Sequence, residues 1–170
     1  MIWIKYVLLI ILFIASFRTG SIISNKYKNR VKELKEYKNA LGIFRTKIKF
    51  TYEPIADIFK QIADMVEESN VGKVFKTASG NMSKMTAERA WERALEESKN
   101  NINEEDKLVL KKLSKLLGKT SLEGQVSEIE MTNTFLESQI KKAENERDKN
   151  EKLYRTLGMT IGLALVIILI

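Results

Sequence analysis

The chain has 170 residues, a formal net charge of +7, and neither cysteine nor histidine. Without these residues there is no disulfide scaffold, zinc finger or iron–sulfur site, and the usual general base of enzymes is missing. The 8 glycines and 1 proline are too few for the frequent turns of an all-β fold. We therefore expect a non-enzymatic protein that uses no metal, cofactor or small-molecule substrate.

The first predicted element is a transmembrane helix within residues 1–23. Residues 1–17 carry a single charge, Lys5. A helix needs about 20 apolar residues to cross a bilayer, and this segment is long enough if Lys5 and Arg18 extend to opposite interfaces. A cleaved signal peptide is the alternative, although Ala15-Ser16-Phe17 matches a cleavage site poorly.

Positive charge follows this segment. Residues 18–49 hold 10 basic and 2 acidic residues, whereas residues 50–140 carry a net charge of −4. Basic residues beside a membrane helix keep their side in the cytoplasm, so we expect both termini outside. They also attract anionic lipid headgroups, unless they serve only to set this orientation. The candidate headgroup contacts are Arg18, Lys26, Lys28 and Arg30. Because no basic recognition helix stands clear of the membrane, we do not expect nucleic-acid binding.

Two long amphipathic helices are predicted in the middle of the chain. Apolar residues recur at steps of three and four over 31–48 and again over 122–157, a spacing typical of helices that pack along a coiled-coil-like seam. No glycine or proline occurs over 126–157, so the second helix is expected to run unbroken into the C-terminal apolar segment. The two helices are expected to pair antiparallel as a stalk.

Shorter helices are expected between them. The first follows Pro54, and residues 69–83 are predicted to be a loop with one short helix at 74–78, because they are weakly periodic and contain two glycines. A further helix carries Trp91. The next begins at Asn103, has apolar positions up to Leu116 and Leu117, and ends at Gly118. The expected capping residues of these later helices are Ser83 or Thr86, Asn103 and Ser121.

The last predicted element is a second transmembrane helix, residues 154–170. Residues 157–170 carry no charge, and the span from Leu153 is about 27 Å of helix. Gly158 and Gly162 form a GxxxG pattern, which lets helix backbones approach closely in lipid. Their partner is either the first helix, through Ala15 and Ser16, or another protein. The predicted architecture is all-α, with about six helices, and a cytoplasmic bundle at 24–153 lies between the transmembrane helices 1–23 and 154–170.

Two further patterns are interpreted as structural. Gly118-Lys119-Thr120 resembles the end of a phosphate-binding loop, but Leu113 stands where the first glycine is needed and a helix precedes it. Acidic pairs such as Glu67-Glu68 are typical of solvated helix faces.

Several stretches resemble the stage III sporulation protein AB family of endospore-forming bacteria. The clearest is Asn150–Gly158 with its continuation at Gly162-Leu163-Ala164, and weaker matches surround Thr51, Pro54, Trp91, Gly118 and Gln125. Tyr52 stands where the family has a proline, and Leu122 where an aspartate is usual. The candidate partner-docking positions from these motifs are Thr51, Pro54, Trp91, Gly118, Gln125 and Tyr154.

The resemblance implies a non-enzymatic platform subunit of a channel between mother cell and forespore. The family is similar to the platform proteins of type II secretion and type IV pilus systems. The implied partners are a secretion-type ATPase and ring-forming membrane subunits, and the implied location is the mother-cell membrane around the forespore. The alternative function is a lipid-binding membrane adaptor that uses the basic segment beside the first helix.

Overall fold

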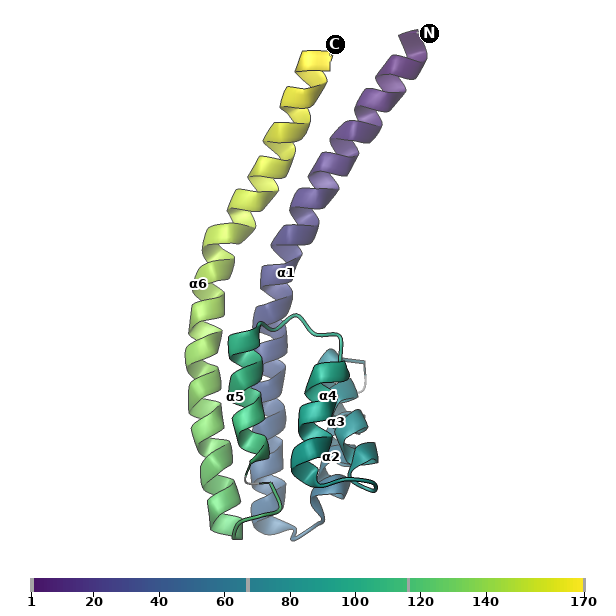
Figure 1. The fold of residues 1–170 in the computed structure, drawn as a ribbon. Coiled ribbons are helices and arrows are strands. Elements are labelled where there is room, and N and C mark those ends of the chain that lie inside the picture. The colour runs from purple at the N-terminus through teal and green to yellow at the C-terminus, as the bar shows by residue number, and fades with distance from the viewer. Residues whose placement is uncertain (1, 67, 116, 170) are drawn as a thin grey trace. The chain divides into compact units, whose positions relative to one another are not determined.

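The computed structural model describes residues 2–66, 68–115 and 117–169, and within these ranges it contains six helices and no strand (Figure 1). The helices are α1 (Ile2–Phe50), α2 (Ile55–Met65), α3 (Asn70–Asn81), α4 (Ala87–Glu97), α5 (Glu104–Ser114) and α6 (Leu122–Leu169). The predicted all-α architecture is confirmed. The first and last helices are both long and apolar enough to cross a membrane.

The chain forms two compact units. One unit, here called the helical bundle, comprises Lys32–Lys141. The other, here called the helix pair, comprises the described residues of 1–31 and 142–170. Helices α1 and α6 contribute residues to both units, and each unit is described by itself below.

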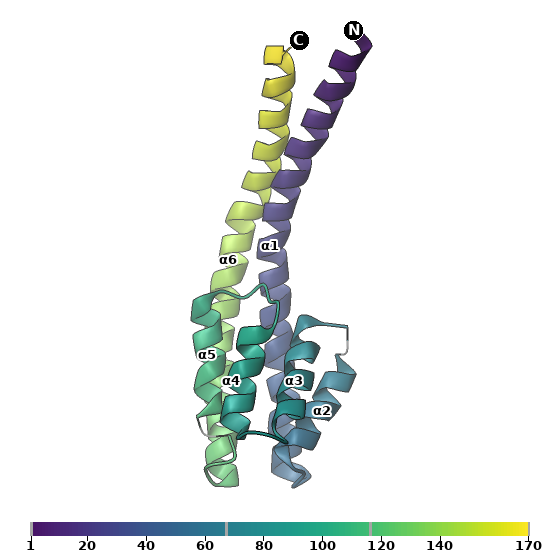
Figure 2. The same cartoon turned by 45° about the vertical axis from the view of Figure 1, so that its right-hand side comes forward.

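Aromatic rings form the centre of the helical bundle. Phe59 of α2 lies edge-on to Phe44 of α1 at 5.0 Å, to Phe75 of α3 at 4.8 Å and to Trp91 of α4 at 5.4 Å between ring centroids. The indole N–H of Trp91 donates to the Leu110 carbonyl of α5 at 2.8 Å. Consecutive short helices are neighbours, with α2 beside α3, α3 beside α4 and α4 beside α5 (Figure 2). Five helices therefore share one core, and its edge-to-face pairs are a favourable aromatic geometry.

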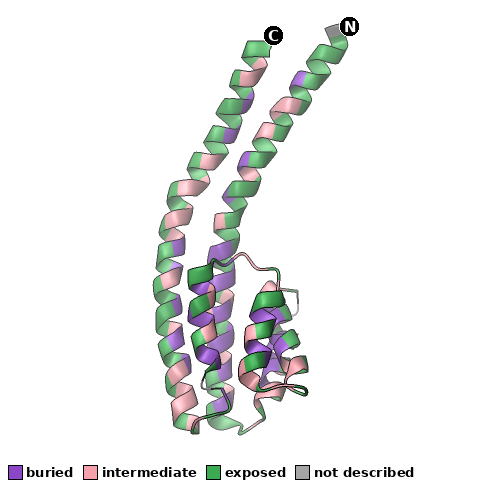
Figure 3. Ribbon diagram, viewed as in Figure 1, coloured by how far each residue is buried: buried purple, intermediate pink, exposed green. Residues whose placement is uncertain are grey.

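The predicted seam of the first long helix is buried in the structure (Figure 3). Within the bundle α6 runs antiparallel to α1. Two ion pairs show this orientation, Lys38 with Glu137 at 3.3 Å and Arg45 with Glu130 at 3.0 Å. The buried seam residues of α1 are Val31, Leu34, Tyr37, Leu41, Phe44 and Ile48, and those of α6 are Ile129, Leu136, Ile140 and Ala143. The spacing of three and four thus marks the buried stripe of α1 and that of α6 over 129–143. Leu157, the last position of the predicted seam, is 42% exposed.

The structure corrects the prediction for residues 69–83. Instead of a loop with a short helix, α3 is a helix of 12 residues, and the Ser69 hydroxyl accepts the Gly72 N–H at 2.9 Å at its start. Glycine at 72 is needed because a Cβ there would lie 2.8 Å from the carbonyl carbon of Val66. The prediction was wrong because the glycines were interpreted as helix breakers. The low helix propensity of Gly72 and Gly80 is outweighed by the burial of Val74, Phe75 and other apolar residues of α3.

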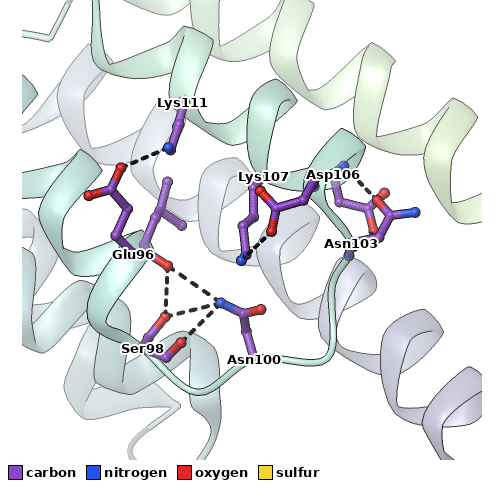
Figure 4. A network of polar contacts seen from close by, with 9 residues as sticks. Glu96, Ser98, Asn100, Asn103, Asp106, Lys107 and Lys111 are labelled. Carbon is purple, nitrogen blue, oxygen red and sulfur yellow. Dashed lines mark hydrogen bonds and ion pairs between the residues drawn. The ribbon is translucent and has the colours of Figure 1, made fainter.

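The later helices begin at the predicted caps. Thr86 caps α4, and Asn103 and Asp106 form a reciprocal capping box at α5, with N–H to oxygen distances of 3.0 and 2.9 Å (Figure 4). The Ser121 hydroxyl accepts the Gly124 N–H at 3.2 Å at the start of α6. Helix α5 ends at Ser114, before the expected Gly118, and the predicted apolar position Leu116 lies outside the described residues.

Candidate functional site

The helix pair is held by glycines of both helices. A Cβ atom on Gly158 of α6 would lie 3.0 Å from the Cα atom of Gly20 and 3.0 Å from the Ser16 carbonyl oxygen. One on Gly162 would lie 3.1 Å from the Ser16 Cβ and 3.1 Å from a ring carbon of Phe13. Both glycines are buried. The GxxxG face of α6 therefore packs against α1 of the same chain.

Of the two residues predicted to face these glycines, only Ser16 does so. Ala15 is exposed, although its carbonyl accepts the Thr19 hydroxyl at 2.9 Å. Sequence reasoning missed Gly20, which is buried against α6. Ser16 and Gly20 are four residues apart, like Gly158 and Gly162, and this shared spacing of small residues was the signal that could have found it.

Polar contacts continue the helix pair beyond the glycines. Tyr27 and Tyr154 stack with ring centroids 6.0 Å apart, and Lys28 pairs with Glu151 at 2.7 Å. Burial, together with a hydrogen bond to the Tyr154 hydroxyl, raises the pKa of Tyr27 above its usual value. Tyr154, a candidate docking position, is therefore part of the contact between α1 and α6.

The candidate lipid contacts divide into two groups. Arg30 is only 6% exposed and donates to the carboxylate of Glu146, so the structure contradicts its assignment as a headgroup contact. Lys28 is exposed but already paired with Glu151. Arg18 and Lys26 are exposed. Of the four candidate headgroup contacts, Arg18, Lys26 and Lys28 are therefore exposed, whereas Arg30 is buried.

The register of the helix pair sets which residue of α6 lies opposite Arg18. Because Gly20 lies opposite Gly158 and Ser16 opposite Gly162, antiparallel pairing puts Arg18 opposite residue 160. Arg155 is five residues away from residue 160 along α6, about 7.5 Å at 1.5 Å per residue. The two arginines therefore lie at different levels along the helix pair.

Four motif residues meet at one end of the helical bundle. The Thr51 N–H and hydroxyl both donate to the Lys47 carbonyl at 2.8 Å, which closes the last turn of α1. The Pro54 carbonyl accepts the first N–H groups of α2, from Asp57 at 3.0 Å and Ile58 at 3.1 Å. Thr51 and Pro54 thus shape the connection between the two helices.

The connection between α5 and α6 lies beside it. Gly118 adopts a φ of 70°, and its N–H donates to the Gln125 side chain at 3.3 Å. The Gln125 amide in turn donates to the Thr120 carbonyl at 3.2 Å. A Cβ on Gly118 would lie 3.8 Å from the Cδ1 atom of Ile55, just after Pro54. We call residues 47–55, 115 and 117–125 together the turn end of the bundle.

Trp91 does not belong to this surface. Its side chain is fully buried in the aromatic core, which contradicts a docking role for the residue itself. Lys119 of the phosphate-loop-like stretch forms an ion pair with Glu88 of α4. The stretch is therefore a turn with a surface ion pair.

Two acidic residues of the bundle, Glu96 and Glu104, pair with lysines. Glu96 pairs with Lys111 at 2.9 Å and raises the pKa of that lysine, whereas Lys107 pairs with Glu104 at 2.7 Å and lowers the pKa of that carboxyl (Figure 4). No cluster of three or more potential metal ligands occurs within the ranges 2–66, 68–115 and 117–169. Glu67 of the predicted acidic pair lies outside these ranges.

Comparison with known proteins agrees with the motifs. Residues 5–170 match the family described as stage III sporulation protein AB. A relative of that name from Bacillus subtilis (strain 168) is 26% identical over 164 residues, which cover 94% of this chain and 95% of the relative. A solved structure of a stage III sporulation protein AB aligns with a TM-score of 0.65 and 22% identity, covering 71% of this chain and 98% of that one. None of these names denotes an enzymatic activity. The chain belongs to the stage III sporulation protein AB family.

Proposed function

We propose that this protein is a non-enzymatic scaffold subunit of the channel that joins mother cell and forespore during spore development. The observation that carries the proposal is the family match over nearly the whole chain. The helix pair supports it. Its two apolar helices pack closely through Gly20 and Gly158, and such a pair would anchor the bundle at a membrane. In this proposal residues 1–23 and 154–170 span the mother-cell membrane, and residues 24–153 lie in the cytoplasm.

The proposed partners are a secretion-type ATPase on the cytoplasmic side and ring-forming membrane subunits of the same channel. The helical bundle offers the surface for the ATPase, and the lipid-facing sides of the helix pair offer the surface for membrane subunits. The short helices share one closely packed core, which would give docking partners a rigid platform.

Deletion of the gene tests this function. We expect spore development to stall after engulfment and the intact gene to restore it. Normal spore yield in the deletion strain would contradict the proposal. A phosphatase fused after Ile170 tests the orientation, since the fusion is expected to be active outside the cytoplasm, and an inactive but expressed fusion would reverse it.

A lipid-binding adaptor is the second candidate function. It is favoured by the exposure of Arg18 and Lys26 beside the apolar segment, where each surface cation contributes about 1 kcal/mol toward anionic lipid. The full chain purified in detergent should retain phosphatidylglycerol over phosphatidylcholine in native mass spectrometry. Replacing Arg18 and Lys26 by Gln should remove this preference. Equal retention of both lipids by the unaltered chain would contradict this function.

A further inference from the structure

We propose that the connection between α1 and α2 binds a partner protein. The binding surface of that partner is an apolar pocket surrounded by acidic side chains. The docking elements are the rings of Phe50 and Tyr52. This inference rests on the proposed scaffold function and adds which part of the chain docks and what chemistry its partner presents.

The two rings are exposed at a place where the surrounding chain is ordered. Phe50 is 68% exposed and Tyr52 is 82% exposed. Between them, Thr51 makes two hydrogen bonds to the Lys47 carbonyl. Exposed aromatic rings offer the largest apolar area that binding can bury, and such residues dominate the energy of many interfaces.

Tyr52 has the left-handed backbone conformation that commonly ends a helix, here α1, but tyrosine is an unfavourable residue for it. Its φ of 53° makes it the one non-glycine residue with a positive φ in the described part of the chain. Asparagine or glycine adopts this conformation readily, whereas a bulky residue there is an outlier. Because its ring is also exposed, folding gains little from a tyrosine at this position. The fold accounts for the backbone turn but not for the choice of tyrosine, and a strained residue of this kind is typical of binding sites.

The connection is preorganised by hydrogen bonds among Lys47, Gln61 and Glu53. The Lys47 ammonium donates to the side-chain oxygen of Gln61 in α2, and the Gln61 amide donates to the Glu53 carboxylate. These contacts tie both sides of the connection to α2. A partner would therefore meet Phe50 and Tyr52 in fixed positions, without the entropic cost of ordering a loop.

The surface around the rings carries net positive charge. The Lys49 ammonium lies 5.4 Å from the Phe50 ring centroid. Within 47–55 and the neighbouring turn at 115–125, four lysines outnumber two acidic residues, Glu53 and Glu123. Lys49 and Lys115 are both exposed. This charge complements Asp and Glu side chains and would speed association with an acidic surface.

Site-specific photo-crosslinking of the full chain in sporulating cells tests the proposal. The photoreactive residue p-benzoylphenylalanine replaces Tyr52, and matched positions of similar exposure serve as controls, Met65 at 59% and Leu108 at 57%. We expect position 52, but neither control, to crosslink to one protein. The crosslinked peptide of that protein should carry Asp or Glu beside apolar residues. A crosslink to lipid, nucleic acid or a second copy of this chain, or no crosslink, would overturn the proposal.

Substitutions then separate docking from folding. Tyr52→Asn removes the ring and suits the backbone, so co-purification of the crosslinked protein should fall about tenfold or more, while the Tm of the full chain in detergent stays equal or rises. Tyr52→Phe should retain the partner. Lys49→Glu should weaken binding, and Lys in place of an acidic residue in the partner's crosslinked peptide should restore it. Unchanged binding of Tyr52→Asn, or a lower Tm together with lost binding, would overturn the proposal.

The two proposals fail in different ways. Normal sporulation of the deletion strain would remove the channel function whatever position 52 contacts. A sporulation defect on deletion, with full spore yield and full partner binding in the Tyr52→Asn strain, would leave the channel function intact and overturn only the docking surface.

Discussion

Gly158 and Gly20 lie so close that a methyl group on Gly158 would sit 3.0 Å from the Gly20 Cα atom. Both residues are buried in the contact between α1 and α6, so the two backbones meet without side chains between them. In lipid there is no hydrophobic force to bring helices together, and close backbone packing takes its place. This contact joins residues 138 positions apart in the chain, so it fixes the register of the helix pair.

Gly158→Ala and Gly158→Leu should therefore loosen the helix pair. Relief of the overlap requires a backbone shift, and overpacking of this kind costs about 1–3 kcal/mol. Leu9 and Val166 line one groove of the helix pair. Because the chain has no cysteine of its own, a disulfide between cysteines introduced at these two positions reports whether α1 and α6 are in contact. We expect disulfide yield to fall in both variants, more in Gly158→Leu. Gly42→Ala is the matched control, because nothing lies within 4 Å of its added Cβ, and unchanged yield in all variants would count against this contact.

Two glycines of α3 should respond to alanine in opposite directions. At Gly72 the added Cβ would overlap the Val66 carbonyl group, so Gly72→Ala should destabilise the bundle by about 3 kcal/mol. At Gly80 nothing lies within 4 Å, and Gly80→Ala should stabilise it by about 0.5 kcal/mol because alanine favours the helix. Thermal unfolding of the full chain followed by circular dichroism measures both. Equal Tm values for the two variants would show that α3 does not begin against the end of α2.

Removal of the Tyr37 hydroxyl should not destabilise the protein. Tyr37 is fully buried, and its hydroxyl has no hydrogen-bond partner within the residues that the structure describes. An unsatisfied buried polar group costs about 1–3 kcal/mol, so Tyr37→Phe should leave the Tm unchanged or raise it at pH 7. A marked loss of Tm would mean that the hydroxyl has a stabilising partner.

The same residue predicts a pH dependence. Burial, and next the negative charges of Glu33 and Glu36, raise the pKa of Tyr37 far above its usual range. A raised pKa gives a stability contribution that is complete below the unfolded value of about 10 and is lost as the pH rises above it. The Tm of the unaltered chain should therefore fall more steeply above pH 10 than that of Tyr37→Phe. Parallel curves would contradict this assignment.

Arg30 and Lys26 should have separable roles. Arg30 is buried and bonded to Glu146. Because the Glu146 side chain is 37% exposed and can be hydrated, Arg30→Gln should lower the free energy of unfolding by about 1–2 kcal/mol. Lys26 is exposed, so Lys26→Gln should change the free energy of unfolding by no more than about 0.5 kcal/mol. Thermal unfolding compares the two variants in one detergent. If Lys26→Gln proved the more destabilising, the assignment of Arg30 as the structural residue would be wrong.

Local patterns were sufficient to predict most of the fold. The steps of three and four along α1 and α6 identified buried stripes because helical periodicity depends only on residues near in sequence. The caps at Thr86, Asn103 and Ser121 were predictable for the same reason. Helix α3 was not, because its glycines oppose helix formation locally and contacts with distant residues decide the outcome.

The candidate sites were predicted less completely than the fold. Gly158 and Gly162 were found from their spacing, but Gly20 was missed, although it stands four residues from Ser16 as Gly162 does from Gly158. Arg30 and Lys26 look alike in sequence, although one is buried against Glu146 and the other is exposed. The left-handed backbone of Tyr52 had no sequence signal, because tyrosine is an unusual residue for that conformation.

The sequence by itself determined that this protein is all-α, that both ends are apolar, that positive charge lies beside them, and which family it belongs to. These properties depend on composition, on short-range periodicity and on motif order along the chain. Only the tertiary structure decided which small residues touch, which cations remain exposed, and that the turns around Pro54 and Gly118 share one end of the bundle. Those features depend on contacts between residues far apart in the chain. The energy of such a contact depends on both partners and on their geometry, so neither residue alone predicts it.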